Sequence, residues 1–413
     1  MLNFIVRLTG LYFADVKQKS PIFRFLTVFR VVLLQIITIV YSLFAIHQLC
    51  TQPGRHTIES LNIEFLLECA WFVQAVLAMI FLIHWQRKGL LQLLMERVII
   101  RPPNKDDNIT EGFIKVRRTM RWMLLICAIL TMNFTGIMAT FVVRHTDNWL
   151  EPYLGFHRFD FIYMFIGVYG FAVSNLTLTL FVVTVRCLYV QLKEFNQKLK
   201  VLLATALTCK DVKLNLSRHL LDLFHIHKNL ADKIQLVDTT FQAYTLVNMS
   251  IGIPTSVLAL IVFIRRRTFL AAFYSLNDTA CCTFQMLGLT IVPAQIYMEF
   301  RSAHEILYRN SAIWVDYDTK LYQIGRMFAK SAVQNHIGIT LGGYIPVTKS
   351  LILTSASLIL PYVLLCIQLQ VGSNYSVLPF SHSDGYRNSS TLLENIILTD
   401  LVWPSNRSSP LKK

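Results

Sequence analysis

The chain is poor in charged residues, and the common catalytic motifs are missing from it. Only 15% of its 413 residues are charged, while 54% are hydrophobic, whereas a soluble domain has about a quarter of its residues charged. The sequence has no H-E-x-x-H, P-loop or G-x-S-x-G motif, and its eight cysteines form no C-x-x-C pair. These absences argue against an enzyme, a zinc site, a disulfide framework or a bound cofactor.

What the chain does have is a series of long hydrophobic runs. They predict an all-α polytopic membrane protein with seven transmembrane helices. The expected spans are 31–49, 63–85, 122–143, 161–185, 243–264, 279–297 and a last span within 343–370. No cleavable signal is recognisable before the first run, so the first span is expected to stay in the mature chain.

Polar segments between the spans keep a helical periodicity. The stretches 86–121 and 186–242 are expected to be cytosolic extensions of the six-helix bundle 31–299, with a further cytosolic anchor segment at 300–342. Within 186–242 and the anchor, apolar side chains recur at steps of three and four, which is the pattern of packed helices: Leu192, Phe195, Leu199 and Leu202, then Leu216, Leu220, Leu223, Leu230, Ile234 and Val237, then Leu321, Ile324 and Phe328. His227 interrupts the second stripe and is expected to be a buried histidine with its hydrogen bonds satisfied.

The distribution of basic residues predicts an inverted topology. With a cytoplasmic N-terminus, 28 of the 39 Lys and Arg residues fall on the inside and 10 on the outside, in agreement with the positive-inside rule. Residues 1–30 are then cytoplasmic, and the polar tail 371–413 is extracellular. The net charge of +15 is explained by attraction to anionic membrane lipids rather than by nucleic-acid binding. Glycosylation is expected at the sequons of Asn277, Asn374, Asn388 and Asn406.

The last span carries a line of polar residues on one helical face. Ser350, Thr354, Ser357 and Pro361 follow at steps of four, three and four, and the face continues near Leu365 and Gln368. Such a line either faces a water-filled pore or holds neighbouring helices together. Spacing alone leaves both readings open.

The same span resembles the signature of the invertebrate gustatory receptors, which are related to the insect odorant receptors. That signature is Thr-Tyr, five apolar residues and Gln-Phe. Tyr362 and Gln368 stand at its spacing, while Pro361 and Leu369 replace its flanking residues. The entry to the span, with Gly343, Lys349 and Ser350, is similar as well.

The resemblance implies a ligand-gated cation channel, a homo- or heterotetramer in the plasma membrane of sensory neurons. A small tastant would bind in the outward half of the first six helices and depolarise the cell. The last helix of each subunit would line the pore. In this reading Leu365 and Gln368 form an apolar ring and an amide ring at the gate, and Tyr362 packs against neighbouring helices. The alternative for Gln368 is a bond to an adjacent helix that only stabilises assembly.

Two acidic residues stand at the entry to the second span. Glu64, Glu68 and Trp71 lie at i, i+4 and i+7, on one helical face. Acids in a span are costly, so they indicate a ligand or ion contact, or else a paired or snorkelling group at the interface. With Asn133, Tyr163, Tyr169 and Gln285 as further lining residues, this face would suit a small polar or amphipathic ligand.

Two other functions remain open. A G-protein-coupled type of seven-helix receptor would have the opposite orientation, and its Asp-Arg-Tyr and Asn-Pro-x-x-Tyr motifs are missing at the corresponding span ends. A secondary transporter could use Glu64 and Glu68 as a cation site, although the two halves show no internal repeat.

Overall fold

The computed structural model describes residues 29, 32, 33, 35–40, 43, 60–99, 108–144, 160–208, 215–265, 269–314, 318–333 and 337–375. Most of the expected first span and the whole of 376–413 lie outside these ranges. The chain divides into two compact units, Met1–Ile367 and Gln368–Lys413. The fold and the sites below belong to the first unit, apart from Gln368, which begins the second. In the second, the description is limited to the last residues of one helix.

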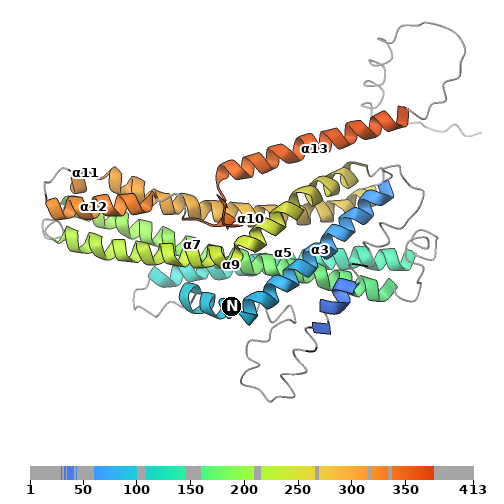
Figure 1. Ribbon diagram of the computed structural model, residues 1–413, viewed down its shortest axis with the longest axis horizontal. Helices are drawn as coiled ribbons and strands as arrows, with labels where there is room; N and C mark the ends of the chain where they lie inside the picture. The colour runs from blue at the N-terminus through green and yellow to red at the C-terminus, as the bar shows by residue number, and fades with distance from the viewer. Residues whose placement is uncertain are drawn as a thin grey trace, which may run out of the picture. The chain divides into compact units, whose positions relative to one another are not determined.

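The described residues are almost entirely helical, as the sequence predicts (Figure 1). In chain order the elements are α3 (Ser60–Arg87), α4 (Leu90–Leu94), the π-helical η2 (Met95–Ile99), α5 (Asn108–Arg144), α7 (Asp160–Thr208), α9 (Leu216–Arg265), α10 (Phe269–Tyr308), α11 (Ser311–Trp314), α12 (Thr319–Ala332), β1 (Thr340–Leu341), β2 (Ile345–Pro346) and α13 (Lys349–Tyr375).

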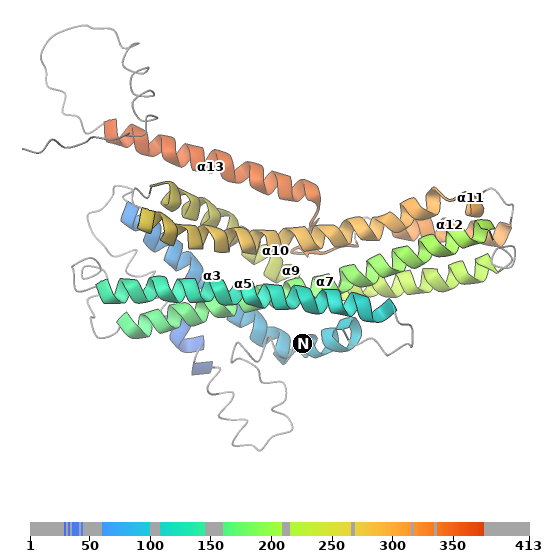
Figure 2. The same cartoon turned by 180° about the vertical axis from the view of Figure 1, so that it is seen from behind.

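α7 is the central helix of the bundle and packs against α3, α5, α9 and α10. Figure 2 shows the same bundle from behind, with α5 running along α7. An aromatic group fills the crossing of α3, α7 and α9, where Trp85 lies 4.7 Å from Phe241 and 5.6 Å from Tyr244 between ring centroids. The indole of Trp85 donates a hydrogen bond to the Thr240 carbonyl at 3.0 Å. This buried crossing fixes the middle of the bundle.

Five helices among the described residues are long and apolar enough to cross a membrane: α3, α5, α7, α9 and α10. In α13 the apolar stretch Lys349–Leu365 is shorter, but its full 27 residues give about 40 Å at 1.5 Å per residue, enough for a hydrocarbon core of about 30 Å. α7 and α9 have 49 and 50 residues. Each is therefore about 75 Å long and extends far beyond a bilayer.

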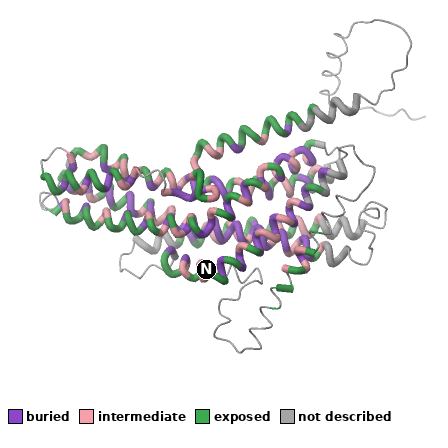
Figure 3. The backbone as a smooth tube through the Cα atoms, in the orientation of Figure 1, coloured by how far each residue is buried: buried purple, intermediate pink, exposed green. Residues whose placement is uncertain are grey.

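The extensions pack as their periodicity predicts. Leu192, Leu199, Leu216 and Leu220 are at most 1% exposed, and the stripes of α7 and α9 join α10 and α12 in one core. Burial runs along the facing sides of these helices (Figure 3). Within the extension 86–121, α4 and η2 also pack inward, because Leu94 and Val98 are buried.

Two helices extend beyond the spans expected for them. The sixth span was expected at 279–297, but α10 begins at Phe269 and ends at Tyr308. The polar residues Asn277 and Asp278, which precede the expected span, lie inside this helix, where Asn277 is buried and Asp278 is half-buried. The last helix also continues past 370, to Tyr375.

A short hairpin, which the sequence did not reveal, precedes α13. β1 and β2 pair antiparallel around Gly342 and Gly343, whose φ angles are 63° and 82°, a region that favours glycine. Added Cβ atoms at these glycines would lie 2.7 Å from Leu246 and 2.8 Å from Gln242. The close approach to α9 therefore requires both glycines.

Candidate functional site

A group of aromatic side chains occupies the end of the bundle where α3 and α7 begin and α5 ends. Trp71 and Phe171 meet edge to face at 5.6 Å between centroids, and Phe134 stacks on Phe171 at 4.5 Å. Leu67, Leu130, Ala259, Cys281 and Cys282 complete the cluster. Such faces bind the apolar body of a small molecule well. We call this group the aromatic cluster.

A chain of buried amides lies beside the aromatic cluster. Gln74 of α3 donates to Asn248 of α9 at 2.9 Å and to Gln285 of α10 at 2.8 Å, and Asn248 donates to the Tyr244 carbonyl at 2.9 Å. All three amide side chains are at most 4% exposed. Three helices are thus linked by hydrogen bonds inside an apolar region, where such bonds are strong and orient their members.

Some polar groups of this region have no hydrogen-bond partner among the residues that the structure describes. Within the described part of the chain, no acceptor is found for the N–H groups of Trp71, Asn175, Asn277 and Gln285. Asn277 lies two turns before Gln285, so both share a face of α10 with Cys281. The thiol of Cys281 donates a hydrogen bond to the side-chain oxygen of Asn175 at 3.7 Å. The N–H groups of the Asn175 side chain remain as donors.

Unsatisfied buried donors are uncommon because each costs about 1–3 kcal/mol. Their gathering beside an aromatic cluster indicates a place where a ligand supplies the missing acceptors. The side-chain oxygen of Asn277 also has no partner within the described residues, so four N–H groups stand beside one acceptor. All of these groups are uncharged, and their chemistry fits a neutral molecule that brings mainly oxygen acceptors.

The residues expected at the ligand site are only partly brought together. Trp71 and Gln285 lie inside the bundle as described above, and Tyr169 is half-buried against the main core. Asn133 is exposed, so its expected inward position is wrong: one residue of rotation places Phe134 toward the bundle instead. The side chains of Glu64, Glu68 and Tyr163 lie outside the described positions.

Several residues of this region were missed by the sequence prediction. Gln74, Asn175 and Asn248 are polar residues in the middle of apolar spans, and that alone could have identified them.

The expected glycosylation of Asn277 does not fit the structure. Its side chain is 4% exposed within α10, whereas a glycan acceptor needs an accessible segment. The side chain of Asn374 and all of Asn388 and Asn406 lie outside the described positions.

The face of α13 chosen as the pore face points away from the bundle. Ser350, Thr354, Ser357, Pro361, Tyr362, Leu365 and Gln368 are all exposed in the single chain. The opposite face meets the bundle: Val363 is 2% exposed and clusters with Ile63 of α3 and with Val257 and Ile261 of α9, and Ile359 packs beside them. The hydroxyls of Thr354 and Ser357 donate to carbonyls of their own helix, so their oxygens keep free lone pairs.

The hairpin before α13 is fastened to α9. Thr340 donates its backbone N–H to Asp238 at 2.6 Å and its hydroxyl to the same carboxylate at 2.8 Å. Gly342 N–H donates to the Gln242 carbonyl at 3.0 Å, and Thr245 donates to the Thr340 carbonyl at 2.9 Å. Burial raises the pKa of the Asp238 carboxyl, while the bonds from Thr340 oppose that shift. The start of α13 therefore follows any movement of α9.

Comparisons with known proteins agree with this architecture. The chain shares its fold with the insect olfactory receptor OR5 of Machilis hrabei, both in complex with eugenol, at a TM-score of 0.69, and in a second structure, at 0.67. Each alignment has 14% identity and covers 89% of this chain and 97% of the receptor chain. No protein-family model and no curated protein matches the chain. The expected all-helical membrane-protein fold, which the chain shares with this olfactory receptor, is thereby confirmed.

Proposed function

We propose that this chain is a subunit of a ligand-gated cation channel, opened by a small neutral organic molecule that binds at the aromatic cluster. The observation that carries the proposal is the set of unpartnered donors on Trp71, Asn175, Asn277 and Gln285 beside aromatic side chains. The olfactory receptor fold supports the channel part.

The chemistry of the site favours one ligand class. Aromatic faces take an apolar ring or chain, while amide and indole N–H groups donate to oxygen atoms. Eugenol, which is bound in one of the olfactory receptor structures, is a methoxyphenol and has this composition. Following the resemblance to gustatory receptors, we infer a tastant of this kind as the natural stimulus of the sensory neuron.

The exposed face of α13 is the proposed pore lining. In a homo- or heterotetramer, four such helices bring hydroxyl oxygens from Ser350, Thr354 and Ser357 around an axis, where they replace part of the water around a cation. Leu365 and Gln368 follow along the same face as the apolar and amide rings of the gate. The exposure of these side chains in the single chain supports this arrangement.

A route from ligand to pore runs along α9. Asn248 joins the amide chain beside the ligand site, and Asp238 holds the hairpin that leads into α13. These two residues are ten positions apart on one continuous helix. A small movement of α9 on ligand binding would therefore reach the start of the pore helix.

The proposal includes the inverted topology, with residues 1–30 and the anchor 300–342 in the cytosol and the tail 371–413 outside, carrying any glycans at Asn374, Asn388 and Asn406. A tag after Lys413 should stain on intact cells, and a tag before Met1 only after permeabilisation. The reverse pattern would favour the G-protein-coupled alternative.

Expression in oocytes under voltage clamp tests the function itself. A panel of neutral phenols, alcohols, esters and sugars should include compounds that evoke an inward cation current, and co-expression with related subunits covers a heteromer. Stoichiometric uptake of the compound with the current would instead support the transporter that uses Glu64 and Glu68.

A further inference from the structure

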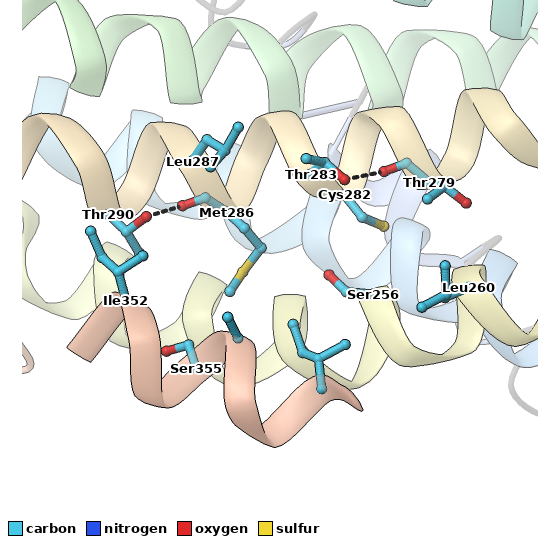
Figure 4. A pocket seen from close by; sticks show the side chains of 12 residues that line it. Ser256, Leu260, Thr279, Cys282, Thr283, Met286, Leu287, Thr290, Ile352 and Ser355 are labelled. Atoms are coloured by element: carbon cyan, nitrogen blue, oxygen red, sulfur yellow. Dashed lines mark hydrogen bonds between the residues drawn. The ribbon is translucent and has the colours of Figure 1, made fainter. Parts of the chain in front are cut away.

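A cavity lies on the side of α13 that faces the bundle (Figure 4). It borders the aromatic cluster, with which it shares Cys282, but none of the unpartnered donors Trp71, Asn175, Asn277 and Gln285 lines it. Its volume is about 260 Å³. α13 contributes Ile352, Ser355, Ala356 and Ile359, and α9 contributes Ser256 and Leu260. A cavity of about 150 Å³ is enough to hold benzene, so this one has room for a single ring or a short chain.

α10 forms the third wall with one of its faces. Thr279, Thr283 and Thr290 alternate there with Cys282, Met286 and Leu287. The residues that line the cavity are uncharged, and most of the wall is carbon. A charged or strongly polar occupant would lose its hydration without compensation, so the cavity selects for neutral, largely apolar molecules.

Each hydroxyl group of the wall donates its proton to a backbone carbonyl of its own helix. Ser256 donates to the Gly252 carbonyl at 2.7 Å, Thr283 to the Thr279 carbonyl at 2.8 Å and Ser355 to the Leu351 carbonyl at 2.9 Å. Thr279 and Thr290 likewise donate to carbonyls of α10. Because each hydroxyl proton is already used, the oxygens can only accept. A molecule that brings one donor of its own, an alcohol or a phenol, matches them.

We propose that this cavity binds a small neutral alcohol or phenol, and that the bound molecule holds the pore helix in its closed position. The second part rests on the proposed channel function. The cavity lies on the face of α13 opposite Ser350, Thr354 and Ser357. If those residues face the pore axis, then α13 must move toward the cavity when the pore widens.

An occupant of the cavity blocks that movement. α13 otherwise meets the bundle through a few apolar side chains, Ile359 and Val363 among them, so space behind the helix is what allows it to shift. Filling the space opposes opening and leaves the donors of the ligand site free, because none of Trp71, Asn175, Asn277 and Gln285 lines the cavity. Alcohols bound here therefore act as inhibitors, and they do not compete with the activating ligand.

The binding site can be tested without any channel activity. The purified full-length chain in lipid nanodiscs is irradiated with an octanol that carries a diazirine, and the adducts are mapped by mass spectrometry. We expect adducts on the α10 and α13 residues that line the cavity, and competition by plain octanol. The variant Ala356→Phe fills the cavity and should lower this labelling about tenfold, because the octanol would then have to overpack the filled space, and a tenfold loss corresponds to about 1.4 kcal/mol.

The matched control is Ala280→Phe, the same change at an alanine of α10 that is exposed, as Ala356 is, but does not line the cavity. It should label like the unmodified chain, and Ala356→Leu gives a milder filling if the larger ring disturbs folding. Equal labelling of Ala356→Phe and Ala280→Phe overturns the site. Protection by added phospholipid but not by octanol assigns the cavity to a lipid tail and also overturns it.

Current recordings decide the regulatory part. Octanol should reduce the ligand-evoked current of the unmodified chain and of Ala280→Phe, but not of Ala356→Phe. If octanol labels the cavity but does not change the current, the alcohol binding site is supported and its inhibition of pore opening is refuted. If the chain gives no ligand-evoked current with any partner subunit, the proposed channel function is contradicted, and so is the proposed inhibition by alcohols. The labelling experiment still decides whether the cavity binds an alcohol.

Discussion

Acid should weaken the helical extension through one histidine, His227. The sequence predicted a buried histidine with its hydrogen bonds satisfied; it is buried, with 0% exposure, but neither ring nitrogen has a partner within the described residues. Phe300 stacks on the ring at 4.4 Å, and Phe328 and Phe195 lie at 5.0 and 5.4 Å between centroids. Burial among these apolar rings lowers the pKa of His227 from 6.5 to about 4.

The direction and size of this change in the free energy of unfolding follow from proton linkage. Between pH 6.5 and about 4 the unfolded chain binds a proton at His227 that the folded chain does not, so the free energy of unfolding falls as the pH falls. Above pH 6.5 His227 is neutral in both the folded and the unfolded chain, so it causes no loss of folding stability there. At about 1.4 kcal/mol per pH unit, the loss is about 2 kcal/mol at pH 5 and about 3 kcal/mol near pH 4.

The assay is the apparent melting temperature of the purified chain between pH 8 and pH 4, at a fixed scan rate because unfolding is often irreversible. His227→Phe keeps a ring among the three phenylalanines and removes both unpartnered nitrogens. We expect it to melt at or above the temperature of the unmodified chain at pH 7.5, and to lose about 2 kcal/mol less on going to pH 5.

The matched control is His225→Phe, two residues away at an exposed position. It should keep the full acid dependence. If His227→Phe and the unmodified chain lose stability in parallel as the pH falls, then the burial of His227 is not the cause and the reasoning fails.

Three further predictions concern the ligand site, the hairpin and the gate. Trp71→Phe, which removes one unpartnered N–H but keeps an aromatic ring, should raise the half-activating ligand concentration about three- to tenfold, while Asn133→Ala should not; equal dose responses would remove Trp71 from the site. In a double-mutant cycle of Asp238→Ala with Thr340→Val, the free energy of unfolding should show a coupling of about 1.5–3 kcal/mol, and additive losses would mean that the carboxylate does not hold the hairpin. Gln368→Ala should change unitary conductance or ion selectivity with tetramers intact on native gels, and unchanged permeation would leave Gln368 a role in assembly only.

The helices could be predicted because their cause is local. Apolar runs and stripes such as Leu216 to Val237 show in the sequence which face of a helix is buried. The helices of the structure agree with these patterns. The start of α10 could not be predicted in this way, since Asn277 and Asp278 are polar and only their neighbours in space make them part of a helix. The hairpin depends on Gly342, Gly343 and a contact with α9 that is distant in sequence.

The candidate site was predictable only in part. Trp71 and Gln285 were named from residue type, and both lie inside the bundle. Asn133 was misplaced because one residue of rotation, about 100°, decides between inside and outside, and apolar helices in a membrane give little sign of that angle. The amide chain through Gln74 and Asn248 joins helices that are 174 residues apart in sequence, so single spans could show its members but not their bonding.

The central claim is that ligand binding opens a pore formed by this chain. The most direct measurement is a recording from the purified chain, alone or with a partner subunit, in a planar bilayer with an activating compound from the oocyte screen. The account predicts unitary cation currents whose open probability rises with the compound and whose conductance changes in Gln368→Ala. A bilayer that stays silent, while cells expressing the chain respond only when a G protein is active, would contradict it.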